Sequence, residues 1–197
     1  MKFVALDFET SGLDSKRHAP VSLGVAVFEG GDVIASAEWT LAPPVDKNGR
    51  VSREYDVCAL QVSGKTWKEI QAGVKCEAVC FALGKFAREH GVSDAAVVAF
   101  NAPFDLSFYS ELLYLGGSWN QHFRRFETFK PPLIGPWQCA RLMAVSQLDL
   151  ERYDLDTTAR HFGLSRSGET HGALEDAILA GRIYQSLTTP THSEAVA

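Results

Sequence analysis

The sequence lacks the features that mark membrane, secreted or duplex-coating proteins. No apolar run approaches the roughly 20 residues of a membrane-spanning helix. Residues 1–7 are apolar but reach an acid too soon for a signal peptide, and no small-residue cleavage site follows. Basic residues number 19 against 24 acidic ones, a net charge of −5 that excludes a broad basic surface for duplex DNA. Acid-rich sites that bind cations remain open.

Close cysteine pairs are also absent. The four cysteines include no CxxC pair of the kind found in zinc and redox sites. Cys76 and Cys80 lie one helical turn apart, which favours two small buried residues. We therefore expect a cytoplasmic protein with reduced thiols.

The chain has 197 residues, of which 46% are hydrophobic and 22% charged, values typical of a globular domain. Three apolar runs, with a Gly-Gly-Asp turn between the second and third, predict an antiparallel meander. Helical periodicity and a short, wholly apolar run follow, which together predict an α/β fold with a mixed sheet in one domain, 1–187, with a loose tail at 188–197. The expected strands are 2–8, 21–29, 33–41 and 95–100, and the expected helices are 66–90, 103–115, 139–147, 154–162 and 171–187.

In the expected helix 66–90, the predicted core-facing stripe is Val74, Ala78, Phe81 and Ala82, and Gly91 ends the helix. Residues 118–137 carry aromatics and prolines without a regular period, so we expect them to be irregular.

Two acids, Asp7 and Glu9, end the first apolar strand. Side chains alternate along a strand, so both point to the side that Phe3 and Ala5 share. Acid-x-acid occurs four times in the chain, and the other three instances stand in polar or irregular surroundings. Two like charges at the end of an apolar strand repel unless a cation joins them. The alternative is an acid pair that faces solvent at the edge of the sheet.

A third acid, Asp105, falls in the first turn of the helix that follows the apolar run 95–100. Helical spacing places it on one face with Phe108, Tyr109 and Leu112, so we expect it to point inward. The alternative is an acid that only caps the helix N-terminus through backbone N–H groups.

The last helix carries His171 and Asp176 near its start. Asp176 lines up with Ala180, Ile183 and Leu187, and an acid on an apolar face is costly unless it is paired or binds metal. His171 is five residues earlier, about 140° around an ideal helix, and can share a site with Asp176 only from the preceding loop or cap. The alternative is a capping or surface histidine.

The acids taken together predict a cation site. Asp7, Glu9, Asp105 and Asp176 lie at the ends of apolar elements and form an oxygen-only, anionic set. Such a set suits Mg²⁺ or Mn²⁺ rather than zinc.

Three motifs in this order resemble those of the DEDDh 3′–5′ exonucleases, the family that includes the proofreading subunit of bacterial replicative polymerase. They are DFETSGL at 7–13, NAPFD at 101–105 and HGALEDA at 171–177. The resemblance covers residues 1–187 and implies a ribonuclease-H-like fold. Two departures are Phe100, where many members have histidine, and Gln138-Cys139-Ala140, where many have an Asp-Thr pair.

The resemblance also implies a mechanism. The four acids would hold two divalent cations, Mg²⁺ or Mn²⁺, and His171 would act as the general base. Single-stranded DNA ends would be hydrolysed to nucleoside 5′-monophosphates, in DNA repair or proofreading.

Substrate contacts follow from the same resemblance. Thr10 matches the position near the terminal 3′-hydroxyl, and Leu13 matches the position that wedges against the terminal bases. Asn101 belongs to the second motif, and Phe104 is a candidate stacking ring or a core residue.

Two further segments offer weaker interaction signals. Arg124, Arg125 and Lys130, interleaved with phenylalanines, form either a strand-contacting segment or a solvated loop. Residues 147–150 (QLDL) resemble the start of a peptide that docks on sliding clamps, so polymerase or clamp association is a possible partnership.

Other functions are weighed against this one. The first is an RNA-trimming 3′–5′ exoribonuclease of the same family, like ribonuclease T or oligoribonuclease. Thr10 favours the proofreading branch, because oligoribonuclease typically has methionine there. An inactive nucleic-acid-binding module is disfavoured, because it would not require all five catalytic residue types. A metal-dependent phosphatase of small molecules is disfavoured, because it does not predict the second and third motifs. The short segment after the last helix leads us to expect a stand-alone enzyme or another mode of attachment.

Overall fold

A mixed sheet organises the chain, as predicted. The computed structural model describes residues 1–117, 131–166 and 172–189, whose strands form one sheet in the order β3-β2-β1-β4-β5. The β1/β2 and β2/β3 pairs are antiparallel, and the β1/β4 and β4/β5 pairs are parallel. The strands are β1 (Lys2–Thr10), β2 (Pro20–Glu29), β3 (Asp32–Thr40), β4 (Ala96–Ala99) and β5 (Trp137–Cys139).

β5 was not predicted, because Trp137 falls in the segment 118–137 expected to be irregular and Cys139 was expected to begin a helix. The strand is only 3 residues long, and its backbone pairs with Val97, Val98 and Ala99 of β4. A strand this short has no measurable period of its own. Its formation depends on β4, which it joins in parallel.

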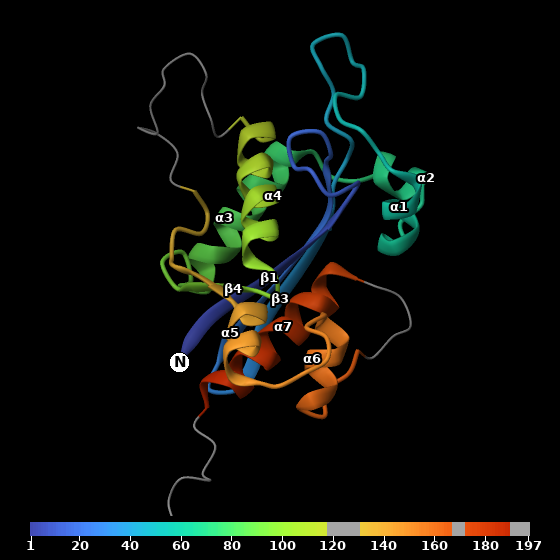
Figure 1. Ribbon diagram of the computed structural model, residues 1–197. Helices are drawn as coiled ribbons and strands as arrows, with labels where there is room; N and C mark the ends of the chain where they lie inside the picture. Colours follow the sequence, from blue (N-terminus) through green and yellow to red (C-terminus); the bar gives the residue numbers. More distant parts are fainter. Residues whose placement is uncertain (118–130, 167–171, 190–197) are drawn as a thin grey trace, which may run out of the picture.

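Helices cover both faces of the sheet. α3 and α4 pack on one face, and α5, α6 and α7 pack on the other (Figure 1). Residues Val4, Leu6 and Phe8 of β1 point to the first face, while Phe3 and Ala5 point to the second. The helices are α1 (Val57–Ser63), α2 (Trp67–Gln71), α3 (Cys76–Glu89), α4 (Ala102–Leu115), α5 (Ala140–Gln147), α6 (Leu155–His161) and α7 (Ala173–Thr188).

The expected single helix 66–90 is two helices, α2 and α3. Thr66 caps α2 in a reciprocal capping box with Glu69. The chain then leaves helical geometry, because the Val74 N–H donates to the Thr40 carbonyl and the Val74 carbonyl accepts from Ala42. These bonds to the end of β3 replace the bonds that would have continued α2. The sequence also gave no sign of α1.

The predicted core-facing stripe of α3 was wrong. Val74 and Phe81 are 41% and 69% exposed, and Ala78 is exposed as well. The helix instead buries Val79, Leu83 and Ala87 together with Cys76 and Cys80, the two cysteines predicted to be buried. Apolar residues occur on both sides of α3, so periodicity alone did not decide which side meets the sheet. All four cysteines are free thiols.

α7 lies close against the sheet because small residues face it. A Cβ atom added at Gly181 would lie 2.3 Å from the Phe28 ring and 3.1 Å from the Ala5 Cβ. A Cβ added at Gly24 of β2 would lie 2.2 Å from the backbone of Ala173, the first residue of α7. Within residues 1–117, 131–166 and 172–189, no helix combines the length and the apolar character needed to cross a bilayer.

Candidate functional site

The first two acids of the site come from β1. Asp7 and Glu9 follow Phe3 and Ala5 on the side of the strand that faces α7, as strand alternation predicts. Asp7 pairs with Gly24 in the register of β1 with β2. Because Gly24 has no side chain, the start of α7 can approach the sheet beside Asp7.

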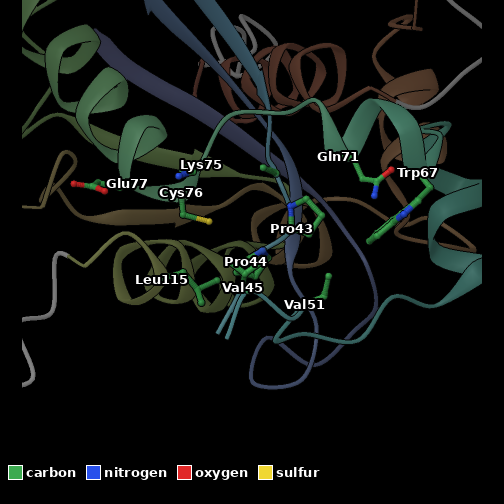
Figure 2. Close-up of a pocket in the computed structure, with 12 residues that line it drawn as sticks. Pro43, Pro44, Val45, Val51, Trp67, Gln71, Lys75, Cys76, Glu77 and Leu115 are labelled. Atoms are coloured by element: carbon green, nitrogen blue, oxygen red, sulfur yellow. The ribbon is translucent and has the colours of Figure 1, made fainter. Parts of the chain in front are cut away.

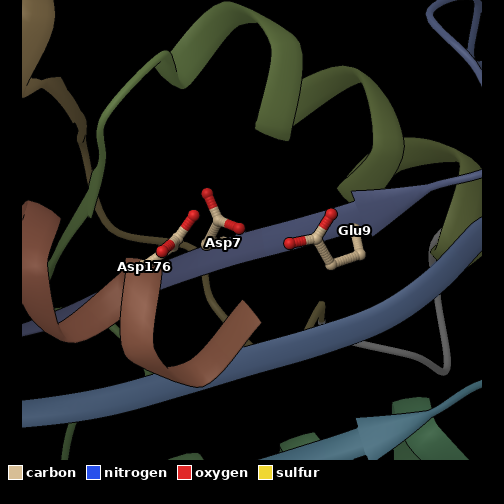
Figure 3. Close-up of side chains that lie close together, drawn as sticks. All are labelled: Asp7, Glu9 and Asp176. Atoms are coloured by element: carbon tan, nitrogen blue, oxygen red, sulfur yellow. The ribbon is translucent and has the colours of Figure 1, made fainter. Parts of the chain in front are cut away.

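The first turn of α7 contributes Asp176. Its backbone N–H donates to the Gly172 carbonyl, and its side chain is almost fully buried. The predicted alignment of Asp176 with Ala180, Ile183 and Leu187 is confirmed, since all four are buried. Figure 3 shows Asp176 beside Asp7, with Glu9 further along β1. One carboxylate oxygen from each of these acids lies within 4.8 Å of the other two.

Asp105 reaches the same strand from α4 on the other face of the sheet. It is 2% exposed and shares its buried face with Phe108, Tyr109 and Leu112, as predicted. Its Oδ1 accepts a hydrogen bond from the Phe8 N–H at 3.3 Å. β4 pairs with β1 only at residues 3–5, so beyond that point the edge of β1 is open to Asp105. Asp105 therefore binds the backbone between Asp7 and Glu9.

The electrostatics show that these acids are crowded. Burial raises the pKa of Asp7 well above its usual range, and the neighbouring charges of Asp105 and Asp176 raise it further. Burial also raises the pKa of Glu9 to about 7, with Asp176 adding to the rise and Arg166 opposing it. The pKa of Asp105 rises to about 7, mainly through burial, although the Phe8 hydrogen bond opposes the shift. Without a cation, the site therefore favours retained protons.

Sequence reasoning missed Arg166, which follows α6 and binds the site. Its Nε lies 2.6 Å from Asp176 Oδ1 and its Nη2 lies 2.9 Å from Asp176 Oδ2. A second carboxylate, that of Asp156 on α6, accepts from Arg166 Nη1. This forked pairing supplies one positive charge to a group of acids. Nothing in the sequence singled out an arginine outside the three motifs.

The predicted substrate-contacting residues stand close to the acids in the sequence. Thr10 Oγ1 donates to the Gly12 carbonyl at 2.8 Å, and Leu13 is 85% exposed. Asn101 precedes α4, and its carbonyl accepts from the N–H groups of Phe104 and Asp105. Phe104 is half-buried, with its ring centroid 4.9 Å from that of Phe108, so part of the ring packs in the core.

Two predictions fall on residues outside the described ranges. His171 lies in 167–171, and Arg124, Arg125 and Lys130 lie in 118–130, so their roles stay predictions. Of the clamp-like segment, Leu148 packs against the core cluster under α5 and α7, and its carbonyl accepts from the Tyr153 hydroxyl.

A pocket elsewhere on the molecule has a different character. Figure 2 shows its walls, which include Pro43, Pro44, Val51, Trp67 and Leu115. None of the residues that line it belongs to the three motifs or to the acid cluster.

The donor set fits a divalent cation. Asp7, Glu9 and Asp176 present only carboxylate oxygens, the ligands that Mg²⁺ and Mn²⁺ prefer. The pKa values of Asp7 and Glu9 are raised mainly by burial, and the nearby positive charge of Arg166 opposes this rise without cancelling it, which leaves room for more positive charge. A divalent cation would supply that charge.

Comparisons with known proteins give relatives of one kind. No protein-family model matches the chain. It is 26% identical over 184 residues to DNA polymerase III PolC-type of Thermotoga maritima, covering 92% of this chain and 11% of that protein. It is 32% identical over 98 residues to DNA polymerase III subunit epsilon of Rickettsia typhi, covering 49% of this chain and 39% of that protein. The chain thus spans well under half the length of these relatives.

Solved structures share the fold at low sequence identity. The nuclease domain of 3′hExo, described as a DEDDh family member and bound to rAMP, has a TM-score of 0.71 at 12% identity, covering 94% of this chain and 90% of that one. Exonuclease I of E. coli in complex with a dT13 oligonucleotide has a TM-score of 0.65 at 14% identity, covering 94% of this chain and 40% of that one. Together with the three motifs, these likenesses show that the chain resembles the DEDDh 3′–5′ exonucleases in sequence and in fold.

Proposed function

We propose that the chain is a divalent-metal-dependent 3′–5′ exonuclease that hydrolyses single-stranded DNA ends to nucleoside 5′-monophosphates. The observation that carries the proposal is the meeting of acids from distant segments. Asp7, Glu9 and Asp176 lie within 4.8 Å of one another, and Asp105 binds the backbone between the first two. The three motifs and the family relatives support the same activity.

Asp7, Glu9, Asp105 and Asp176 would hold two cations, Mg²⁺ or Mn²⁺. When bound, the cations would lower the pKa of an attacking water and stabilise the negative charge that develops on the departing 3′ oxygen. Asp7 and Glu9 are fixed by β1, and Asp105 is fixed by its bond from Phe8, so these ligands need little reorganisation. A rigid ligand set favours one orientation of the scissile phosphate.

We assign His171 as the general base that accepts the proton of the attacking water. In the sequence it directly precedes Gly172, the N-cap residue of α7, and stands five residues before Asp176. A neutral imidazole accepts a proton near pH 7. Thr10, Leu13, Asn101 and Phe104 would then bind the terminal nucleotides.

The substrate class is the finer part of the proposal. Solved neighbours include a protein bound to rAMP and another bound to a DNA oligonucleotide, so the fold is compatible with either sugar. The sequence relatives are DNA polymerase III proteins, which supports DNA as the substrate. An RNA-trimming enzyme is the second candidate. Binding to a polymerase or a sliding clamp stays a prediction, since Leu148 is partly used in the core.

The test is a direct digestion. The purified protein is incubated with Mg²⁺ or Mn²⁺ and 5′-labelled single-stranded DNA and RNA of one sequence. We expect a ladder shortened from the 3′ end, faster on DNA, and released 5′-monophosphates. Asp7→Asn, which keeps the size of the side chain, is the matched inactive control. Absence of shortening on both polymers with either metal would refute the proposal, and faster RNA shortening would favour the second candidate.

A further inference from the structure

Leu13 is an exposed apolar side chain on a firmly held turn. It is 85% exposed and follows Glu9 by four residues, three residues after the end of β1. A large apolar side chain gains nothing from exposure to water, and one held on a fixed backbone meets a ligand at a low cost in entropy. The contacts that fix this turn, residues 11–18, therefore affect how a substrate binds.

Ser11 anchors the base of the turn. It is fully buried, and its N–H donates to the Ala19 carbonyl at 2.9 Å. Its Oγ accepts from the Ala19 N–H at 2.8 Å and donates to the Glu54 carbonyl. The Ser11 carbonyl in turn accepts from the Asp56 N–H at 2.8 Å. The turn is thus joined to the segment 52–56 through both the side chain and the backbone of Ser11.

His18 fills the inside of the turn. Its ring is buried against Gly12, where an added Cβ would lie 2.3 Å from the His18 Cδ2 atom. His18 Nδ1 lies 3.1 Å from the Asp14 amide nitrogen and 3.0 Å from the Asp14 carbonyl oxygen, and Nε2 lies 3.3 Å from Asp56 Oδ2. Because an ionised carboxylate only accepts hydrogen bonds, we assign a ring proton to Nε2, which then donates to Asp56. The ring therefore binds the residues on both sides of Leu13.

The segment that carries Asp56 is itself attached to the helix that carries Asp105. Arg53 Nε donates to Glu111 Oε1 at 3.1 Å, and Glu111 is a buried residue of α4. Lys16, within the turn, places its Nζ 3.7 Å from Glu111 Oε2. The buried Glu111 carboxylate fixes this geometry, because losing its partners would leave an unpaired buried charge. The position of Leu13 is thereby tied to α4.

We propose that His18, supported by Asp56, is a positioning residue that holds Leu13 against the base next to the 3′-terminal nucleotide. The inference rests on the proposed function, because it needs a single strand entering at the acids. His18 does not touch the reacting atoms. It acts through Leu13, whose contact with a base would hold the terminal phosphate in register with the acid cluster. Loss of this register would lower kcat/KM for a single-stranded oligonucleotide. It would lower kcat/KM less for a substrate that has no second base.

The test compares two substrates. One is a short single-stranded oligonucleotide, and the other is thymidine 5′-(4-nitrophenyl phosphate), which keeps one nucleotide but has no neighbouring base. We expect His18→Ala and Asp56→Ala to lower the ratio of kcat/KM for the oligonucleotide to that for the ester by about tenfold, mainly through KM, as for a misplaced substrate. Asp56 is 59% exposed in its side chain, so D56A tests the inference even if H18A fails to fold.

A double-mutant cycle with Leu13→Ala gives the sharper result. If His18 acts through Leu13, H18A adds no further loss to L13A in the oligonucleotide assay. His90→Ala, at the end of α3, is the matched histidine control and should leave the ratio unchanged. Equal losses on both substrates, or additive losses in the cycle, would overturn the inference. A wild-type protein that hydrolyses neither substrate would instead refute the proposed function.

Discussion

Replacing Arg166 with glutamine should tighten the binding of a divalent cation to the acid cluster. Arg166 holds both oxygens of Asp176, one of the acids that would ligate the cation, and its side chain is only 12% exposed. A cation that takes an Asp176 oxygen must displace at least one of these bonds. Arg166 and the cation therefore compete for one carboxylate, and the variant removes the competitor.

The magnitude follows from the bonds that are lost. Hydrogen bonds to charged groups contribute about 1.5–3 kcal/mol each, which would correspond to a change in affinity of about 10- to 100-fold. Arg166 also pairs with Asp156, so its guanidinium retains the hydrogen bond to the Asp156 carboxylate when it leaves Asp176. This second partner lowers the cost of displacement. We therefore expect the lower end of the range, an affinity about tenfold higher in R166Q.

Isothermal titration calorimetry with Mn²⁺ at fixed pH measures the effect without relying on catalysis. Arg160→Gln is the matched control, because Arg160 is an exposed arginine of α6 that binds Thr157 Oγ1 and the Asp156 carbonyl. In the absence of metal, R166Q should also melt at a lower temperature than the wild-type protein. Added Mn²⁺ should remove this difference in melting temperature. An unchanged or weaker affinity in R166Q would refute the competition and indicate that Arg166 supports the ligand geometry.

Three further predictions follow from the same site. Without metal, the free energy of unfolding should fall as pH rises from about 4 to about 7. The pKa values of Glu9 and Asp105 are raised in the folded protein, so over this range it holds protons that the unfolded chain has released. Fluorimetric melting should show a smaller fall in Glu9→Gln. His171→Ala should lower turnover about 100- to 10,000-fold while calorimetry shows metal binding intact, and full activity would remove His171 as the base. Gly24→Ala should destabilise the fold by about 1–3 kcal/mol and weaken metal binding, whereas Gly84→Ala, inside α3 beside a flexible arginine, should do neither.

Local spacing in the sequence was enough to predict which way the acids point. Alternation along β1 placed Asp7 and Glu9 on one side, and helical spacing placed Asp105 and Asp176 on buried faces. These are properties of single elements, and a period of two or of 3.6 residues expresses them directly. The order of three strands and the mixed sheet were predictable for the same reason.

Features that depend on two elements meeting were not predictable. Asp105 can bind the Phe8 N–H only because β4 stops pairing with β1 at Ala5, and no local pattern states where a parallel pair ends. The face of α3 was misjudged because both of its sides carry apolar residues, Phe81 among them. Arg166 lies beyond the end of α6, where periodicity gives no direction, so its bond to Asp176 could come only from coordinates.

The closeness of the acids is imposed by packing at some distance from their charges. Carboxylates in a buried cluster repel, as the raised pKa of Asp7 records, so the acids themselves favour separation. The opposing force comes from α7, whose Gly181 lies against Phe28 and whose first residue lies against Gly24. Burial of this helix face supplies favourable free energy through apolar contact, which holds Asp176 beside Asp7 before any cation binds. A cation would then enter a preformed site and relieve the repulsion, so metal binding should stabilise the fold more as pH rises and protons no longer compete.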